Sequence, residues 1–388
     1  MCSVNDAGDI EDLSNSVPIS KIKTKIVPNK CNKCKENQPH ILLRNKDAYC
    51  RDCFMASTDH KFRALLGKHR LINDKDRILI DYKGGHPTTS LLNFIKTGLE
   101  VDTPKKIKFV PICLFIEDQF NIPEGNNRSL ILNNINDEVK RFQIPIFFSS
   151  LVDYYKVDDV CITDKIEDVL SNTQDNNVVD KVFKTSETLV NDLENIYRRR
   201  LLISAAKKLN CKYIFSPEIS TDIASQILSD VALGRGSQIP SNTGFCDDRD
   251  GDVKILRPLK VFDIKELALY NYFHNLDPVI LSVKPPTTSI QNFIEDFVDK
   301  LQSSYPATVT TILKTGDKLS MVNSKKKGAE TCYICQSPNE VPLQTLTSSR
   351  AVDFSFMISD SKELVSMEST NVDRRICFSC SKIENFLL

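Results

Sequence analysis

The sequence lacks the features that mark membrane-spanning and secreted proteins. No apolar run in its 388 residues approaches the roughly 20 residues that a membrane-spanning helix needs. The amino terminus is polar and acidic and has no apolar segment of the kind found in secretory signals. We therefore expect a soluble intracellular protein.

The chain also lacks an excess of charge of either sign, and it has no internal sequence repeat. Its 51 lysines and arginines balance 51 aspartates and glutamates, so any affinity for nucleic acid must come from local basic patches. The length allows a sizeable hydrophobic core and roughly two or three structural units.

Cysteine, in contrast, is abundant. Of the 13 cysteines, eight form four Cys-x-x-Cys pairs, two near each end of the chain. In a chain that is neither small nor secreted, such pairs favour metal binding over disulfides. Two of these turns can aim four thiolates at one ion, which predicts two structural zinc sites, with iron as the alternative metal. The predicted ligands are Cys31, Cys34, Cys50 and Cys53 in the first set and Cys332, Cys335, Cys377 and Cys380 in the second. Whether each set binds its own ion or the sets share ligands stays open.

A strand, a glycine turn and a hydroxyl-rich segment follow one another after the first cysteine set. The apolar residues 78–80 predict a buried strand. A helix is expected to begin near Leu91, capped by one of the hydroxyl side chains. Backbone N–H groups at such a turn can bind a phosphate, although an ordinary strand-to-helix connection has the same pattern. The candidate phosphate-binding residues are Gly84, Gly85, Thr88, Thr89 and Ser90.

Strand-like and helix-like patterns alternate along the rest of the chain. This alternation predicts an α/β fold with a parallel sheet. The expected strands are 108–116, 144–148 and 211–215, the expected helices are 54–72, 131–142, 196–209, 221–233 and 263–273, and residues 289–313 are a further helical region. Asp263 is the expected N-cap of the helix 263–273, with Glu266 three residues on. The predicted organisation is a mobile tail (1–29), a zinc module (30–54), a basic linker helix (55–77), the α/β domain (78–324) and a second zinc module (325–388).

Basic side chains gather at several places. Each patch is either a solvated face or a set of contacts to nucleic-acid phosphates. The candidates are Lys30, Lys33, Lys61, Arg63, Lys68, Arg70, Arg198, Arg199 and Arg200, with a further basic linker at 325–327.

The order of the predicted parts resembles that of the tRNA 2-thiolation enzymes built on the ATP pyrophosphatase (PP-loop) fold. The parts that carry the resemblance are, in order, the zinc module, the Gly-Gly loop, the α/β body, Arg257-Pro258-Leu259 and the terminal zinc module. The resemblance runs from Cys31 to the end and is closer to the divergent second subunit of these enzymes, in which proline and hydroxyl residues follow the glycines. It implies 2-thiolation of the wobble uridine (U34) of tRNA. It also implies a heterodimer with a catalytic paralogue that takes sulfur from a thiocarboxylated ubiquitin-like carrier.

The positions that carry the chemistry in the catalytic paralogue are degenerate here. Asn191 and Glu194 stand where the paralogue has a Cys-x-x-Cys pair, and Asp222 alone survives from its acidic loop. Residues 284–286 replace a third cysteine, and Lys83 replaces the first serine of the phosphate loop. The resemblance therefore implies a pseudo-enzyme without catalytic residues and without an iron–sulfur cluster, which binds tRNA as a scaffold. Whether a nucleotide still binds stays open.

Two other functions remain compatible with the sequence. An autonomous ATP-dependent tRNA sulfurtransferase would use the glycine loop and one of the dispersed cysteines. A zinc-ribbon interaction protein would have no connection with tRNA. The sequence also does not decide between a homodimer and a heterodimer.

Overall fold

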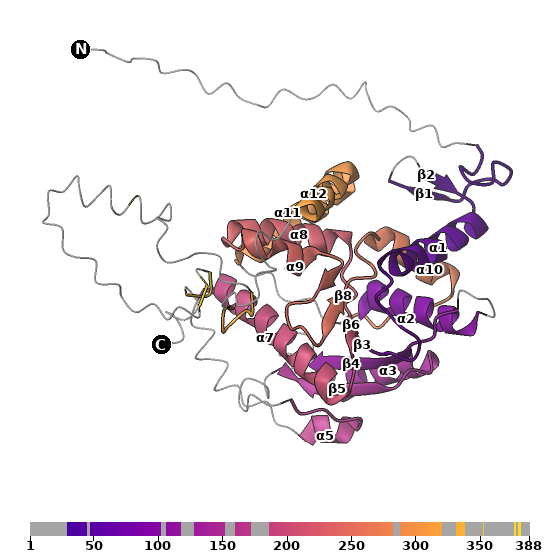
Figure 1. Cartoon of the computed structure of the whole chain (residues 1–388). Helices are drawn as coiled ribbons and strands as arrows, with labels where there is room; N and C mark the ends of the chain where they lie inside the picture. Colours follow the sequence, from indigo (N-terminus) through magenta and orange to yellow (C-terminus); the bar gives the residue numbers. More distant parts are fainter. Residues whose placement is uncertain are drawn as a thin grey trace, which may run out of the picture. The chain divides into compact units, whose positions relative to one another are not determined.

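The computed structural model describes residues 29–44, 47–101, 106–117, 128–151, 160–171, 186–281, 288–319, 331–337, 352, 376–377 and 379–381. These belong to two compact units, Met1–Phe54 and Met55–Leu388 (Figure 1). The predicted linker at 325–327, the replaced cysteine position at 284–286 and all but one residue of the predicted tail lie outside the described residues.

The described part of the first unit contains a small antiparallel hairpin. Strand β1 (Ile41–Leu43) pairs with β2 (Asp47–Tyr49), and Ile41 lies opposite Tyr49. Helix α1 (Arg51–His69) begins directly after Cys50 and continues into the second unit. The hairpin therefore lies between the two Cys-x-x-Cys turns of the first set.

The second unit is built on a six-stranded sheet, counted over the described residues, with the strand order β5-β4-β3-β6-β8-β7. All neighbours are parallel except the pair β7 and β8, which confirms the predicted α/β fold. The central strand is the predicted one, and its residues Ile78, Leu79 and Ile80 are fully buried. The strands are β3 (Arg77–Tyr82), β4 (Val110–Glu117), β5 (Ile146–Ser150), β6 (Tyr213–Phe215), β7 (Cys246–Asp247) and β8 (Lys254–Leu256).

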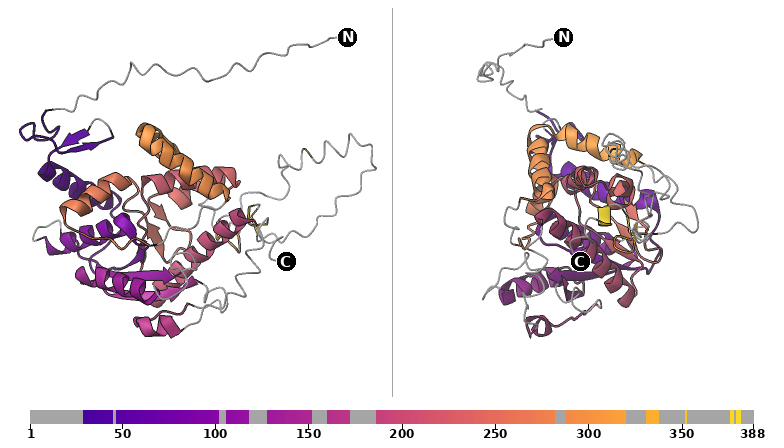
Figure 2. Two further views of the ribbon diagram at one scale, coloured as in Figure 1. Left: turned by 180° about the vertical axis from the view of Figure 1, so that it is seen from behind. Right: turned by 90° about the vertical axis from the view of Figure 1, so that its left-hand side faces the viewer.

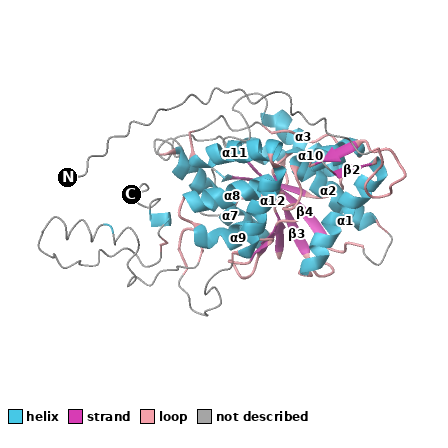
Figure 3. Ribbon diagram, turned by 90° about the horizontal axis from the view of Figure 1, so that it is seen from above, coloured by secondary structure: helices cyan, strands magenta, loops and turns pink. Residues whose placement is uncertain are grey.

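Helices lie on both sides of this sheet (Figure 3). Alternate residues of a strand point to opposite faces, and Leu79 packs in one cluster with Leu201 and Ala205 of α7. On the other face Tyr82 donates a hydrogen bond to Glu138 of α3. The helices of the second unit after α1 are α2 (Gly85–Glu100), α3 (Arg128–Arg141), α5 (Ile166–Ser171), α7 (Glu187–Lys208), α8 (Ser220–Ala232), α9 (Ile239–Thr243), α10 (Ile264–Phe273), α11 (Ile290–Ser304) and α12 (Pro306–Lys318), with a short 3-10 turn, η2 (Gly236–Gln238).

The helical region 289–313 contains two helices, because the chain breaks at Tyr305 directly before Pro306. Proline disfavours the helical conformation in the residue that precedes it. Both helices pack on the outer side of α8 (Figure 2). Helix α2 begins at Gly85 rather than near Leu91, so the hydroxyl residues lie inside its first turns. The short strands β7 and β8 had no counterpart in the sequence-based prediction.

The start of α10 provides a test of these local assignments. Asp263 accepts a hydrogen bond from the backbone N–H of Glu266 at 2.8 Å, as its predicted role of N-cap requires. We expect Asp263→Ala to lower the free energy of unfolding by about 1 kcal/mol. Chemical denaturation should show this loss, whereas Asp263→Asn, which keeps an acceptor, should retain most of the stability. Equal losses in both variants would contradict the capping role.

Candidate metal centres and phosphate loop

The first cysteine set forms a compact cluster of thiols. The Sγ atoms of Cys31, Cys34, Cys50 and Cys53 lie within 4.8 Å of one another, and those of Cys34 and Cys50 are 3.9 Å apart. A tetrahedral metal with four thiolate ligands places the sulfurs ~3.8 Å apart, whereas a disulfide needs about 2 Å. The side-chain amide of Asn37 donates to Cys50 Sγ at 3.9 Å. The cluster fits one tetrahedral ion.

The second set gathers in the same way, although 41 residues separate its two pairs. All four Sγ atoms lie within 4.8 Å of one another, and those of Cys335 and Cys377 are 3.7 Å apart. Each set therefore forms its own cluster, and the structure gives no reason for ligands to be shared between them. Both clusters can hold a metal ion, as the sequence predicted.

Polar side chains from the body of the second unit donate hydrogen bonds to the thiols of the second cluster. The amide of Gln238 lies 3.7 Å from the Sγ atoms of both Cys335 and Cys377. Arg235, buried in the protein, lies 3.8 Å from Cys380 Sγ and pairs with Asp192 at 2.5 Å. Such donors stabilise thiolates and orient them toward a metal. Neither residue stands out in the sequence, because both lie far from the cysteines along the chain, in the loop and turn after α8.

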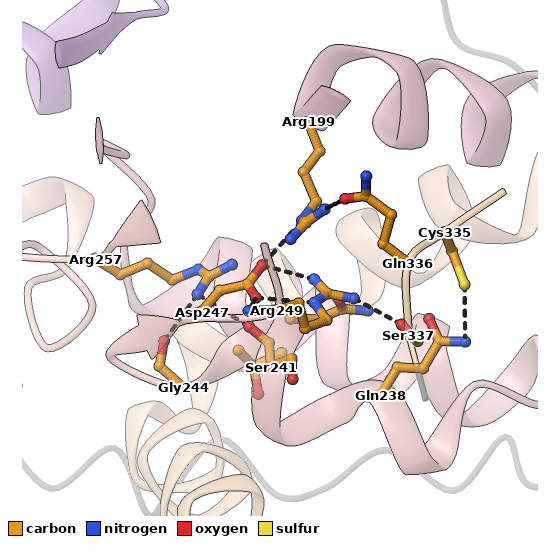
Figure 4. A network of polar contacts seen from close by, with 12 residues as sticks. Arg199, Gln238, Ser241, Gly244, Asp247, Arg249, Arg257, Cys335, Gln336 and Ser337 are labelled. Atoms are coloured by element: carbon orange, nitrogen blue, oxygen red, sulfur yellow. Dashed lines mark hydrogen bonds and ion pairs between the residues drawn. The ribbon is translucent and has the colours of Figure 1, made fainter. Parts of the chain in front are cut away.

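A network of arginines ties the second cluster to the sheet (Figure 4). Arg199 on α7 contacts Asp247 at 2.9 Å and Gln336, next to the ligand Cys335, at 2.7 Å. Arg249 bonds Asp247 at 2.7 Å and donates to Ser337 at 2.9 Å. Burial alone would raise the pKa of Asp247, but the hydrogen bonds and charges of Arg249 and Arg199 hold it well below its usual range. Asp247 is thus an ionised, buried anchor for both arginines.

The three arginines predicted to contact nucleic acid have internal partners. Arg198 bonds Asp81 at 2.6 Å, Arg199 bonds Asp247, and Arg200 donates to the backbone carbonyl of Tyr333. A guanidinium held by a buried carboxylate offers little charge to a phosphate. These contacts give Arg198 and Arg199 a structural role, and Arg200 is held to the segment of the second cluster by the Tyr333 carbonyl.

The other basic candidates divide into two groups. Lys61 bonds Glu266 at 2.7 Å and lies 4.1 Å from the centre of the Phe262 ring, so it too has a structural role. Lys30, Lys33 and Lys68 are exposed, as is Arg70, and Arg63 is half-buried on α1. The candidates of this second group keep their side chains available to a phosphate.

The glycine turn is occupied by another part of the chain. The N–H of Gly85, the first residue of α2, donates to the backbone carbonyl of Val279 at 2.9 Å. The N–H of Val279 in turn donates to Glu138 at 2.9 Å. Gly84 has a φ of 73°, and a Cβ atom there would lie 2.9 Å from the Val279 oxygen and from Leu281 Cγ. The two glycines therefore allow residues 279–281 to approach the turn closely.

The hydroxyl groups of the predicted phosphate loop also point into the protein. Thr88 accepts a hydrogen bond from the N–H of Lys83 at 3.3 Å. Thr89 donates to Glu138 at 2.5 Å, and Ser90 donates to Asn271 at 2.7 Å. All three side chains are buried. In this conformation they complete the core around α2, α3 and α10.

A chain of ion pairs lies beyond the carboxyl end of β3, where a PP-loop protein would bind the phosphates. Arg198 pairs with Asp81, whose other oxygen lies 3.7 Å from the ammonium group of Lys83. Lys83 also lies 3.6 Å from Glu218, which Arg257 contacts at 2.6 Å. Burial would raise the pKa of Glu218, but the charges of Arg257 and Lys83 lower it below its usual range. Each of the three cations named here, Lys83, Arg198 and Arg257, has a carboxylate partner.

The degenerate positions have structural roles as well. Asn191 donates to the Ser289 hydroxyl at 2.9 Å, and Glu194 is buried in α7. Asp222 accepts from the N–H of Ile219 at 3.0 Å and closes the first turn of α8. Burial raises the pKa of Asp222 to about 6, which leaves it ionised at neutral pH and able to balance the charge of Lys83. Asn191 and Asp222 thus stabilise the starts of α11 and α8.

The metal centres predict a selective effect of their hydrogen-bond donors. Gln238→Leu removes the amide donor at the second cluster, and it should make the metal ion of that cluster ~10-fold easier for a chelator to remove. Asn37→Leu is the matched variant at the first cluster and should weaken the other ion instead. Release of metal to a chromogenic chelator measures both. The same release phase changing in both variants would contradict two separate sites.

The glycine turn predicts an effect on stability without any nucleotide. Gly84→Ala would place a Cβ atom against Val279 in a left-handed backbone conformation, and it should cost about 2 kcal/mol or more. Gly67→Ala is the control, because Gly67 lies in α1 with open space around it and alanine favours a helix. Thermal unfolding should show a lower midpoint only for Gly84→Ala. Unchanged stability would show that residues 279–281 do not pack on the turn in solution.

Comparison with known proteins agrees with this architecture. A family model for cytoplasmic tRNA 2-thiolation protein 2 matches residues 289–382. The protein of that name from Anopheles gambiae is 33% identical over 319 residues, which cover 79% of this chain and 74% of the relative. That from Drosophila erecta is 29% identical over 410 residues, covering 99% of this chain and 98% of the relative.

Among solved structures, the U34-tRNA thiolase NcsA from Methanococcus maripaludis, determined with its [4Fe-4S] cluster, aligns with a TM-score of 0.56 at 15% identity. The alignment covers 80% of this chain and 96% of NcsA, which shows a shared fold. Among the described residues, none of the helices is both long and apolar enough to cross a membrane. The predicted resemblance is confirmed: this chain belongs to the cytoplasmic tRNA 2-thiolation protein 2 family.

Proposed function

We propose that this chain acts in the 2-thiolation of the wobble uridine (U34) of tRNA in the cytoplasm, as a non-catalytic subunit beside a catalytic paralogue. Membership of the family supports the role in 2-thiolation. The observation that supports a non-catalytic role is the glycine turn, whose first helical N–H is already bound to the carbonyl of Val279.

Thiolation of a uridine requires two chemical steps. Its C2 oxygen is first activated by adenylation with Mg-ATP, which needs uncompensated positive charge or metal ions at the phosphates. Here the cations at the carboxyl end of β3 are paired: Arg198 with Asp81, Arg257 with Glu218, and Lys83 with both carboxylates. A triphosphate would have to displace these partners. The adenylation step therefore belongs to the partner subunit.

The second step needs a nucleophilic sulfur. In the described α/β body, the cysteines outside the two metal clusters are Cys113, Cys161, Cys211 and Cys246, and none belongs to a group of potential metal ligands. Burial raises the pKa of the Cys113 thiol, and burial also raises the pKa of Cys246 to about 11, so both thiols stay protonated. Asn191 and Glu194 offer no thiolate. The carrier would accordingly deliver its sulfur to the partner.

The chain's own contribution would be to hold tRNA and to maintain the frame of the complex. Zinc is the metal that best suits two tetrahedral all-cysteine clusters, and it would supply structure rather than chemistry, because four thiolates leave no open position. Exposed cations for phosphate contacts lie around the first cluster, at Lys30 and Lys33, and on α1, at Lys68. Arg63 and Arg70 extend the set on and just after α1.

The tRNA contacts predict a charge-dependent change in affinity. Replacing Arg63 and Lys68 with glutamate should weaken tRNA binding and reduce the slope of log Kd against log salt by about one for each contact removed. The matched control replaces Lys140 and Lys165, which are exposed elsewhere in the second unit, with glutamate. Binding measured across a salt series should change only in the first variant. Equal losses in the two variants would show that net charge, and not α1, governs binding.

Reconstitution tests the proposed function as a whole. With ATP, a sulfur donor and tRNA, this chain alone and the catalytic paralogue alone should form little 2-thiouridine, and the mixture should form it readily. The modified nucleoside can be quantified by mass spectrometry. Product from this chain alone would contradict the non-catalytic role and favour an autonomous sulfurtransferase. No requirement for this chain in the mixture would contradict its place in the complex.

A further inference from the structure

Basic side chains gather at the amino-terminal edge of the six-stranded sheet. Strands β3, β4, β6 and β8 are parallel, so their first residues meet at one edge, opposite the edge that has the glycine turn. Arg77 is the first residue of β3, and Lys212 directly precedes β6. Lys75 and Lys108 lie two residues before β3 and β4. All four side chains are exposed, and we call Lys75, Arg77, Lys108 and Lys212 the edge cations.

Backbone hydrogen bonds fix the edge cations beside one another. The N–H of Lys75 donates to the carbonyl of Lys108 at 2.9 Å, and the N–H of Lys212 donates to the carbonyl of Arg77 at 3.2 Å. Strands β4, β3 and β6 are direct neighbours in the sheet. Neighbouring strands lie ~4.8 Å apart, so the four residues spread over ~10 Å. Four segments that are distant in the sequence or lie in a turn thus form one continuous basic row.

Carboxylates balance only part of this positive charge. Lys108 pairs with Asp74 at 3.0 Å, but these side chains are 55% and 68% exposed, and an exposed pair of this kind is weak. Lys212 lies 3.1 Å from the buried carboxylate of Asp76 and is itself 66% exposed. The other two edge cations have no carboxylate partner among the residues that the structure describes. The edge therefore has a net positive charge.

This excess of positive charge is confined to the starts of β4, β3 and β6. The loop 248–252, which leads into β8, has three aspartates and one arginine, and its Asp250 pairs with Lys207 at 2.9 Å. Between α2 and β4, the exposed Glu100 and Lys106 add one charge of each sign. Neither region extends the basic row.

The end of α1 does extend it. The hydroxyl of Tyr213, the first residue of β6, donates to the carbonyl of Leu71 at 2.5 Å. This contact places the residues just after α1 beside the edge cation that precedes Tyr213. Lys68 and Arg70, which are exposed, lie directly before this contact in the sequence. The basic end of α1 and the edge cations are therefore parts of one surface.

The chemistry of this surface indicates a polyanion. Like charges that lie side by side on neighbouring strands are destabilising, so the row is best accommodated when an anion binds to it. A nucleic-acid backbone offers a charge at every nucleotide. The two aromatic side chains next to the edge cations, Phe109 and Tyr213, are buried and offer no ring face on which a base could stack. Such a surface contacts phosphates and does not read bases.

We propose that the edge cations bind backbone phosphates of tRNA without reading its sequence. This inference rests on the proposed function, because it takes tRNA as the ligand from there. It adds a contact surface beyond α1, on the side of the sheet away from the glycine turn. The RNA contact is therefore independent of the altered phosphate loop.

The test measures tRNA binding by the full-length, metal-loaded chain across a salt series. Lys75→Gln combined with Arg77→Gln should weaken binding about 10-fold at low salt and reduce the slope of log Kd against log salt by about two. Thermal stability should not fall, because neither side chain has a carboxylate partner among the described residues. The matched control is Lys314→Gln combined with Lys318→Gln, which removes two exposed cations from α12 and should bind as the wild type does. An unrelated RNA of equal length should lose as much affinity for the first variant as tRNA does.

The outcomes separate this inference from the proposed function. If the wild type binds tRNA and the Lys75 and Arg77 variant binds it equally well at every salt concentration, the edge is not a contact, while the proposed function stands. If the wild type does not bind tRNA, its proposed role in holding tRNA fails and this inference with it. Equal losses in both variants would show that net charge alone governs binding. A loss for tRNA but not for the unrelated RNA would contradict recognition of phosphates alone. A loss of affinity for the catalytic paralogue instead of tRNA would make the edge a protein interface and overturn the inference.

Discussion

The altered phosphate loop is organised around two hydrogen bonds of the Val279 backbone. Its carbonyl accepts the N–H of Gly85 and its N–H donates to Glu138, both at 2.9 Å. Glu138 also accepts the hydroxyls of Tyr82 and Thr89. One buried carboxylate therefore joins β3, α2 and the segment after α10. The glycines that would expose N–H groups to a phosphate in a PP-loop instead let this segment approach, and a buried hydrogen-bonded carboxylate of this kind is costly to leave without its partners.

Side chains of α7 also make structural contacts. Its arginines hold Asp81 at the end of β3, Asp247 in β7 and the segment that contains the second metal cluster. Asn191 fixes the start of α11, and Asp192 supports Arg235 beside the thiol of Cys380. Helix α7 thus connects the sheet, the second metal cluster and the start of α11.

Local signals in the sequence predicted the features that depend on near neighbours. The Cys-x-x-Cys pairs identified both metal clusters, and the aspartate followed by glutamate at 263 and 266 identified the cap of α10. The sequence did not predict the partners of Arg198 and Arg199, which lie 117 and 48 residues away, so a row of arginines resembled a nucleic-acid contact. The sequence predicts a helix cap among residues 88–90. It does not reveal the buried partners Glu138 and Asn271, because these come from distant elements. Pairing over such separations depends on the folded topology and leaves no periodic trace in the sequence.

The most direct measurement of the central claim is calorimetric titration of the metal-loaded chain with Mg-ATP. If the glycine turn is filled by residues 279–281 and the nearby cations are paired, no saturable heat should appear up to millimolar nucleotide, and added ATP should leave the unfolding temperature unchanged. Saturable binding that raises the unfolding temperature and is abolished by Gly85→Asp would show a working phosphate loop. That result would contradict the account of this chain as a non-catalytic subunit.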